Sequence, residues 1–243
     1  MKKKIIIFGN PKAGTSVIAH LLADYGKLSK SIDIPTLWPP IAVEVMLGRL
    51  DFKKFVTNNK DYFNNEVIKE PWMSYFHSKV IKMFPTAIYI TVVRDPRDNI
   101  RSYLNRKSLP GNLKRLTMDQ EKKAGYPYLF DSKIWNVSYG NYVSVLAHRW
   151  NLAADSYLIN QDKVLLVRYE DFCKDKYGFI STLAKQLGII KKDDISKKLN
   201  MQYQPRGDRK ISWNDFFGQK NLSEIEHICA LRMKQFKYML CYR

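Results

Sequence analysis

The sequence predicts an α/β fold of three layers, in which a mainly parallel central sheet is flanked by helices. Two observations predict it. The segments Lys4 to Phe8, Ala87 to Val93 and Lys163 to Val167 are nearly unbroken apolar runs rich in β-branched and aromatic residues, as in strands buried on both faces. Amphipathic helical patterns separate these runs, and strands that alternate with helices form parallel sheets.

Helical patterns occupy most of the chain between the strands. The helices expected in chain order span Thr15 to Tyr25, Met73 to Phe84, Pro96 to Lys107, Tyr139 to Ile159, Gly178 to Leu187 and Ser223 to Met239. Gly26 is expected as the C′ residue of the first helix. Glu66 to Lys69 is a fourth, shorter strand candidate. In contrast, Ser108 to Ser138 lacks apolar periodicity and is rich in Gly, Pro and Lys, which predicts a mobile loop region that could serve as a lid.

Size and composition predict a single domain over residues 1–243, because the chain can bury one substantial core and shows no compositional break. No apolar run reaches the roughly 18 residues of a membrane-spanning helix, and the first run is too short for a secretory signal. Cys173, Cys229 and Cys241 lie far apart without CxxC spacing, as expected for free thiols in a reducing compartment. We therefore expect a cytoplasmic protein without a transmembrane segment, with peripheral attachment to a membrane left open.

The chain is strongly basic, since 41 Lys and Arg against 23 Asp and Glu give a formal net charge of +18. This charge favours anionic ligands or surfaces without naming them. A polyanion-binding protein is therefore one alternative function. The basic residues form no repeated arm and no recognised nucleic-acid module, so we expect no nucleic-acid partner.

A glycine-bearing loop, Gly9-Asn10-Pro11-Lys12-Ala13-Gly14-Thr15-Ser16, joins the first strand to the first helix. Such a loop directs backbone N–H groups and the positive end of the helix dipole at one point, which suits a phosphate. The two glycines have the spacing of P-loop nucleotide triphosphatases, but Thr15 stands where those proteins need lysine, and the cation is Lys12 instead. The predicted fold is therefore P-loop-like. A P-loop kinase of a small metabolite is the alternative enzyme.

A second anion site is expected at the end of the strand that precedes Arg94. Ser102 and Arg106 lie four residues apart on one face of the next helix, so that they and Arg94 can converge on a phosphate monoester. Arg97 and Arg101 are expected to be ordinary exposed residues of that helix.

Together these motifs resemble those of sulfotransferases that use 3′-phosphoadenosine-5′-phosphosulfate (PAPS), in particular the bacterial and tyrosylprotein-like branch. Pro11 to Ser16 resembles the family's 5′-phosphosulfate loop, with Ala13 in place of the usual serine. Arg94, followed eight residues later by Ser102, is similar to the family's 3′-phosphate site. Arg106 resembles an additional phosphate-contacting arginine of the tyrosylprotein branch.

Three weaker matches follow in the family's order. Lys69-Glu70-Pro71 resembles its K-[DE]-P segment. The match at Arg168-Tyr169-Glu170-Asp171 implies that Tyr169 packs near the adenine, and a core aromatic is the alternative interpretation. A basic loop before Trp213 resembles the one that closes over the nucleotide phosphates, and its residues are Arg206, Arg209 and Lys210.

The resemblance implies an enzyme that moves a sulfuryl group from PAPS to a hydroxyl acceptor and releases adenosine 3′,5′-bisphosphate (PAP). The loop residues implied to bind the cofactor are Lys12, Ala13, Gly14, Thr15 and Ser16. Lys12 would stabilise the negative charge that grows on the leaving phosphate oxygen. Because a sulfuryl group carries less charge than a terminal phosphoryl group, we expect no metal requirement.

The general base is less well defined by the resemblance. In the tyrosylprotein and glycolipid branches, the base is a carboxylate about twenty residues beyond the loop cation. Asp33 resembles it in position, because it follows Lys12 by 21 residues. Three alternatives stay open: Glu44, Glu70 and His148. Lys69 is expected to donate a hydrogen bond to the transferring sulfuryl group or its leaving oxygen. The acceptor itself is open between a glycan, a lipid-linked sugar, a small alcohol and a tyrosine, with Ile34 to Leu50 and Ser108 to Ser138 expected to line its pocket.

Overall fold

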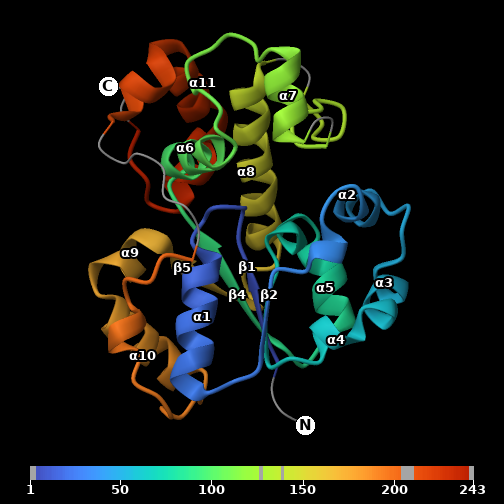
Figure 1. The fold of residues 1–243 in the computed structure, drawn as a ribbon, viewed down its shortest axis with the longest axis vertical. Coiled ribbons are helices and arrows are strands. Elements are labelled where there is room, and N and C mark those ends of the chain that lie inside the picture. Colours follow the sequence, from blue (N-terminus) through green and yellow to red (C-terminus); the bar gives the residue numbers. More distant parts are fainter. Residues whose placement is uncertain (1–3, 126–127, 138–139, 204–210, 241–243) are drawn as a thin grey trace. The chain divides into compact units, whose positions relative to one another are not determined.

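The computed structural model of the chain describes residues 4–125, 128–137, 140–203 and 211–240. It divides into two compact units, which are described in turn (Figure 1). The sheet unit comprises residues 1–93 and 156–203, and the helical unit comprises residues 94–155 and 204–243.

The sheet unit is built on five parallel strands in the order β2-β3-β1-β4-β5. The strands are β1 (Ile5–Phe8), β2 (Lys30–Ile32), β3 (Val67–Lys69), β4 (Ile88–Val93) and β5 (Val164–Arg168). In the centre of the sheet, Ile7 of β1 pairs with Lys69 on one side and with Ile90 on the other. The predicted α/β class and its parallel sheet are confirmed. The short edge strand β2 was not predicted, because Lys30-Ser31-Ile32 has no apolar run to mark it.

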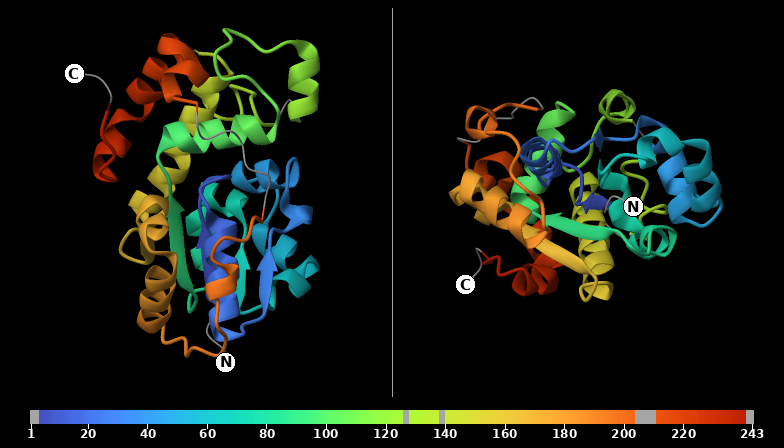
Figure 2. Two further views of the ribbon diagram at one scale, coloured as in Figure 1. Left: turned by 60° about the vertical axis from the view of Figure 1, so that its left-hand side comes forward. Right: turned by 90° about the horizontal axis from the view of Figure 1, so that it is seen from below.

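Helices cover both faces of this sheet (Figure 2). Those of the sheet unit are α1 (Thr15–Gly26), η1 (Pro35–Leu37), α2 (Ile41–Met46), α3 (Phe52–Asn58), α4 (Lys60–Phe63), η2 (Pro71–Tyr75), α5 (His77–Met83), α9 (Tyr169–Lys174), α10 (Lys176–Gln186) and η3 (Ser196–Lys198). Ile5 and Ile7 pack with α1, α9 and α10 on one face. Phe8 points to the other face, where its ring stacks on His77 of α5 at 3.9 Å between centroids. Burial on both faces explains why these strands read as unbroken apolar runs.

Several predicted helix boundaries were wrong, and the largest difference is at the last helix, α11, which spans Trp213–Gln235 and not Ser223 to Met239. The first helix runs through Gly26, and Lys27 in the left-handed conformation (φ 50°) ends it by donating its N–H to Asp24 and Ala23 carbonyls. The helix expected over Met73 to Phe84 is broken at Phe76, which separates the 3-10 helix η2 from α5.

The helical unit contains α6 (Pro96–Arg106), α7 (Met118–Ala124), most of α8 (Tyr142–Ile159) and α11 (Trp213–Gln235). The segment over residues 108–138, predicted as a mobile loop region, contains the helix α7, while its mobility and its role as a lid stay predictions. Thr117 starts α7 with a capping box to Gln120, and this region buries several apolar side chains: Leu109, Ala124, Leu129, Phe130, Trp135 and Val137. These apolar residues are irregularly spaced, so they show no helical or strand period.

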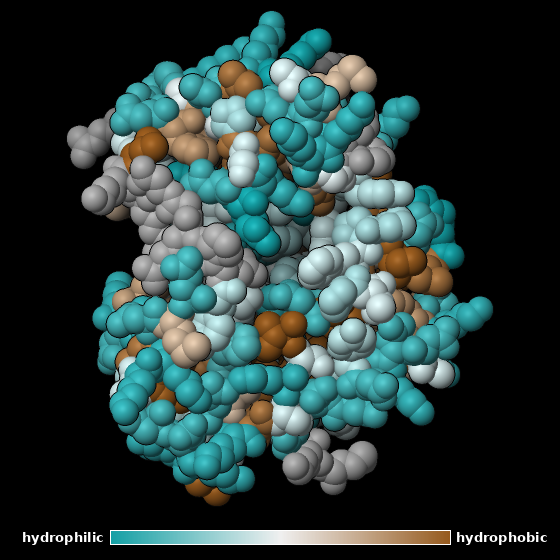
Figure 3. Space-filling model, viewed as in Figure 1, coloured by the Kyte–Doolittle hydropathy of each residue, from teal (hydrophilic) through white to brown (hydrophobic). Residues whose placement is uncertain are grey.

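Hydrophilic residues cover most of the face seen in Figure 3, where hydrophobic residues form small separate groups. Within the part of the chain that the structure describes, no helix is long and apolar enough to cross a membrane.

Candidate active site

The glycine-bearing loop follows β1 and leads into α1, as the sequence predicted. Lys12 (φ 74°) and Gly14 (φ 100°) both adopt left-handed backbone conformations, so the chain turns sharply just before Thr15. A side chain at Gly9 would not fit, because its Cβ would lie 2.5 Å from Cγ2 of Thr15 and 2.7 Å from the carbonyl oxygen of Val92. Gly14 precedes α1 and offers its first turn no side-chain cap. The first N–H groups of α1 are therefore available to an anionic ligand.

Two adjacent residues of η2 hold this loop. The Gly9 N–H donates a hydrogen bond to Oγ of Ser74 (2.7 Å), and the hydroxyl of Tyr75 donates to Oδ1 of Asn10 (2.5 Å). Sequence reasoning missed both residues. Only their place just after the Lys69-Glu70-Pro71 segment could have pointed to them.

The ring of Tyr169 lies directly against the loop. A Cβ atom at Gly14 would come within 2.2 Å of Cδ2 of Tyr169, so only glycine allows this contact. Tyr169 is half-buried and packs on the apolar core beneath it. The position suits a core aromatic that also borders the phosphate loop, and its role toward adenine stays a prediction.

Connections leave β1 and β3 toward opposite faces of the sheet, since α1 packs on one face and α5 on the other. In parallel sheets, ligands bind at the carboxyl ends of two neighbouring strands whose connections diverge in this way. The phosphate loop lies at that end of β1, and Lys69 is the last residue of β3.

Lys69 and Asp33 form an ion pair at this end of the sheet. Nζ of Lys69 lies 2.5 Å from Oδ1 of Asp33. The lysine side chain is 1% exposed and the aspartate side chain is 27% exposed, so solvent reaches the carboxylate but not the amine. Two of the three candidate catalytic residues of this unit, Lys69 and Asp33, are therefore in direct contact.

The alternative bases lie in less suitable surroundings. Glu44 is bound by both Nε and a terminal nitrogen of Arg49 at 2.7 Å, which lowers the pKa of its carboxyl. Glu70 is fully buried. His148, on α8, borders a pocket of about 550 Å³ in the helical unit, and burial lowers its pKa.

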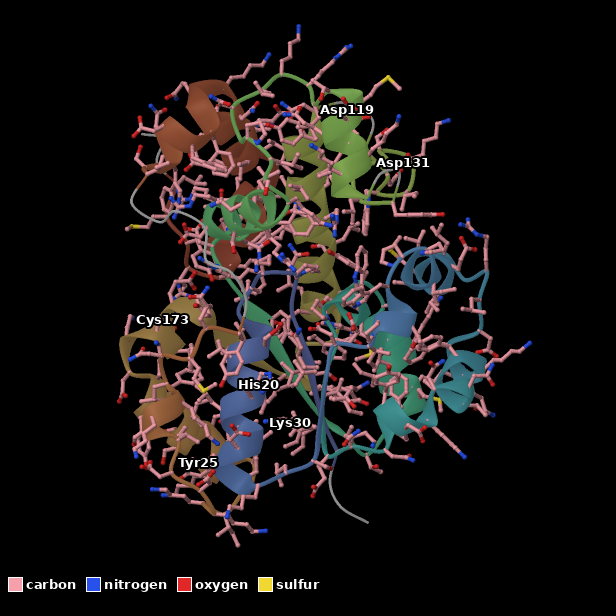
Figure 4. The ribbon with its side chains drawn as sticks, in the orientation of Figure 1. His20, Tyr25, Lys30, Asp119, Asp131 and Cys173 are labelled. Atoms are coloured by element: carbon pink, nitrogen blue, oxygen red, sulfur yellow. The ribbon has the colours of Figure 1, made fainter. Side chains whose placement is uncertain are left out.

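The two histidines of the sheet unit, His20 and His77, lie in surroundings that suit a structural role. The ring of His20, which Figure 4 shows on α1, stacks on Tyr203 at 4.2 Å between centroids. His77 is fully buried, and neither of its ring nitrogens has a hydrogen-bond partner within the described residues. Burial lowers the pKa of His77 to about 3, so the ring is neutral at pH 7.

The predicted 3′-phosphate residues lie at the start of the helical unit. Arg94 is 8% exposed, and its carbonyl oxygen accepts a hydrogen bond from Nε1 of Trp150 (2.9 Å). On α6, Ser102 is half-buried and Arg106 is exposed. The helical register between these two residues is as predicted, while their convergence with Arg94 on one phosphate stays a prediction.

Arg97 and Arg101 are not exposed helix residues, and that expectation was wrong. Arg97 is 3% exposed, forms ion pairs with Asp95 and Glu226 at 2.6 Å, and lies under the ring of Trp213 at 3.9 Å. Guanidinium groups can be buried in this way because paired carboxylates and an aromatic face replace water.

Asp98 links α6 to the beginning of α11. It accepts hydrogen bonds from Arg101 (2.7 Å) and from Nε1 of Trp213 (2.8 Å), and it lies 4.0 Å from Arg94. Arg101 also donates to the carbonyl oxygen of Ile211. The residues just after the predicted basic loop are thus tied to α6. The basic residues of that loop themselves lie outside the described residues: Arg206, Arg209 and Lys210.

Comparison with known structures agrees with the P-loop-like fold. A sulfotransferase from Mycobacterium avium aligns with 100% of this chain and 79% of its own at 14% identity and a TM-score of 0.60. A sulfotransferase from Alicyclobacillus acidocaldarius aligns with 99% of this chain and 98% of its own, at 15% identity and a TM-score of 0.55. A mouse sulfotransferase complexed with PAP aligns with 96% of this chain and 85% of its own, at 17% identity and a TM-score of 0.51.

The sequence comparisons name the family. No curated protein sequence matches this chain. The sulfotransferase domain family matches residues 2–206, which include the phosphate loop, the Lys69–Asp33 pair and the segment from Arg94 to Arg106. Because this match covers most of the chain, the protein belongs to the sulfotransferase family, whose enzymes transfer sulfuryl groups.

Proposed function

We propose that this enzyme transfers the sulfuryl group of PAPS to a hydroxyl acceptor and releases PAP. The observation that carries the proposal is local to the sheet unit. A phosphate loop that carries Lys12 instead of a Walker lysine follows β1. The Lys69–Asp33 ion pair lies at the carboxyl end of the neighbouring strand β3. An anion cradle beside a lysine and a carboxylate suits the transfer of an anionic group to a hydroxyl.

The phosphate loop fits the 5′ side of PAPS. Left-handed conformations at Lys12 and Gly14 direct successive backbone N–H groups toward one anion, and the absence of side chains at Gly9 and Gly14 leaves the turn tight. We assign the 5′-phosphosulfate to Lys12, Ala13, Gly14, Thr15 and Ser16.

The remaining cofactor residues are assigned from the family resemblance. Arg94, which directly follows β4, would bind the 3′-phosphate with Ser102 and Arg106. Tyr169 would pack near the adenine. The basic loop residues would close over the phosphates: Arg206, Arg209 and Lys210. We further propose that both units act as one sulfotransferase domain, since the family match includes segments of each.

Each residue of the Lys12, Lys69 and Asp33 set has a distinct task in this proposal. Lys12 stabilises the charge that develops on the leaving phosphate oxygen. Asp33 accepts the proton of the acceptor hydroxyl. Lys69 has three N–H donors, so it can pair with Asp33 through one of them and donate another to the sulfuryl group or its leaving oxygen.

No metal ion is required in this scheme, because lysine and backbone donors can balance the single negative charge of a sulfuryl group. The acceptor class remains a glycan, a lipid-linked sugar, a small alcohol or a tyrosine. The cytoplasmic location stays a prediction from the sequence.

Calorimetry tests the proposal, with PAP titrated in EDTA and ATP titrated in a separate buffer that contains Mg²⁺. We expect PAP to bind without metal and ATP with Mg²⁺ to bind far more weakly. Tight binding of ATP with Mg²⁺ and no binding of PAP would instead support the kinase alternative. High affinity for oligonucleotides with a steep salt dependence would support the polyanion binder.

A further inference from the structure

Glu70 lies immediately after Lys69 and is fully buried. Its two carboxylate oxygens accept hydrogen bonds from two backbone N–H groups: Oε2 from Ile34 (2.6 Å) and Oε1 from Trp72 (3.0 Å). The second bond caps η2, which is a common role for a carboxylate. The first bond reaches across to the chain that follows β2, where Ile34 is the residue next to Asp33.

Asp33 has its backbone in the left-handed region (φ 66°), which most residues with side chains avoid and which aspartate adopts more readily than most. Its own N–H donates to the carbonyl oxygen of Lys69 (2.9 Å), and the following N–H, that of Ile34, donates to Glu70. The two bonds fix the peptide groups on both sides of Asp33. They thereby set where its carboxylate meets Nζ of Lys69.

Glu70 is not placed to act as the base itself. The residue is 0% exposed, and both of its oxygens already accept hydrogen bonds from the backbone. Burial raises the pKa of Glu70 to about 7, while the two N–H donors and Lys69 oppose the rise and Asp33 adds to it. A group in this position can act on the reaction only through its neighbours.

We propose that Glu70 is the positioning residue of the Lys69–Asp33 pair: by holding the Ile34 N–H, it keeps Asp33 in its left-handed conformation against Lys69. The proposal rests on the function proposed above for Asp33 and Lys69.

The same two strands provide a matched control at their other end. Glu66 precedes β3 as Glu70 follows it, and Oε2 of Glu66 accepts hydrogen bonds from the N–H (3.0 Å) and the hydroxyl (3.1 Å) of Ser29, just before β2. Both glutamates therefore bridge β2 and β3, but only Glu70 adjoins the ion pair. Glu70→Gln keeps the side-chain volume and replaces one of the two acceptor oxygens with an NH₂ group, which cannot accept a backbone N–H, and Glu70→Ala removes both acceptors.

The direct measurement is hydrogen exchange of the Ile34 amide by NMR in the protein without ligand. Glu70→Gln should accelerate this exchange by tenfold or more, and Glu66→Gln should leave it unchanged. An Ile34 amide that exchanges equally in wild type, Glu70→Gln and Glu70→Ala would overturn the proposal, whether or not the protein binds PAP.

The kinetic test uses release of PAP from PAPS with water as the acceptor. Glu70→Gln should lower the turnover rate about tenfold with PAP affinity changed less than twofold, and Glu66→Gln should change neither. In an Asp33→Asn background, Glu70→Gln should have less than a twofold further effect, because it acts through Asp33. A full additional loss in that background would show that Glu70 acts elsewhere. If wild-type protein fails to bind PAP, the proposed function is wrong, and the exchange measurement still decides the placement of Asp33 by Glu70.

Discussion

Lys12 and Lys27 stand at the two ends of α1, both in the left-handed conformation. Their backbone settings are alike, but the helix dipole favours anions only at the end where Lys12 lies. We therefore expect the position of its charge, and not its backbone conformation, to give Lys12 a function that Lys27 lacks.

We expect Lys12→Ala to lower kcat by about a hundredfold while changing PAP affinity much less, because the charge that Lys12 stabilises grows only in the transition state. Lys27→Ala is the control, since it causes the same change of residue at a similar φ. Single-turnover kinetics and calorimetry measure the two quantities. Equal losses of kcat and affinity in Lys12→Ala would contradict this role.

For Arg94, the expected effect is on binding. Arg94→Ala should weaken PAP binding by several-fold to a thousandfold, because a charge-assisted contact to a phosphate is lost. Adenosine 5′-phosphosulfate, which lacks the 3′-phosphate, should bind wild type and Arg94→Ala about equally. Arg49→Ala, at a surface ion pair, is a control for the loss of charge. Similar losses for both ligands would move Arg94 away from the 3′ site.

At the scale of elements, the phosphate loop depends on η2. Ser74 and Tyr75 bind its first two residues, so the 3-10 helix that follows β3 shapes the loop that follows β1. Glu70 caps the same 3-10 helix. One short element thus supports both the phosphate loop and the Lys69–Asp33 pair.

Removing one of these contacts should loosen the loop without unfolding the domain. Tyr75→Phe should reduce PAP affinity about threefold to tenfold, because the Asn10 side chain loses its donor and the loop must be ordered on binding. Tyr62→Phe on α4 is the control. Calorimetry gives the affinities and thermal unfolding reports stability. Unchanged PAP affinity in Tyr75→Phe would show that the loop is rigid without this bond.

At the scale of the whole molecule, His77 couples stability to pH. Its pKa is about 3 when folded against about 6.5 unfolded, so the unfolded state takes up a proton first as the pH falls below 6.5. The free energy of unfolding should therefore fall between pH 6.5 and pH 3.

His77→Phe should remove this loss while keeping an aromatic ring against Phe8. Between pH 7 and pH 5, wild type should lose about 2 kcal/mol more unfolding free energy than the variant. Urea unfolding at the two pH values measures it. The titration of Glu70, present in both proteins, cancels in the difference. Parallel pH dependence in the two proteins would mean that His77 already takes up its proton when folded.

The sequence by itself determined the α/β class, four of the five strands and the phosphate loop, because unbroken apolar runs and glycine-bearing turns are local patterns. It also pointed to the sulfotransferase family through Lys12, Arg94 and Ser102. Tertiary structure alone decided the rest. Arg97 and Arg101 looked exposed because their partners, Glu226 and Ile211, are more than a hundred residues away along the chain.

Burial and pairing likewise depend on residues that the sheet brings together. Asp33 and Lys69 are 36 residues apart and meet because β2 and β3 are parallel neighbours. Glu70 looked like a possible base in the sequence, whereas the structure surrounds it with two backbone donors and no solvent. Sequence patterns record the periodicity of each element, but the charge state and task of a polar side chain depend on the atoms packed around it.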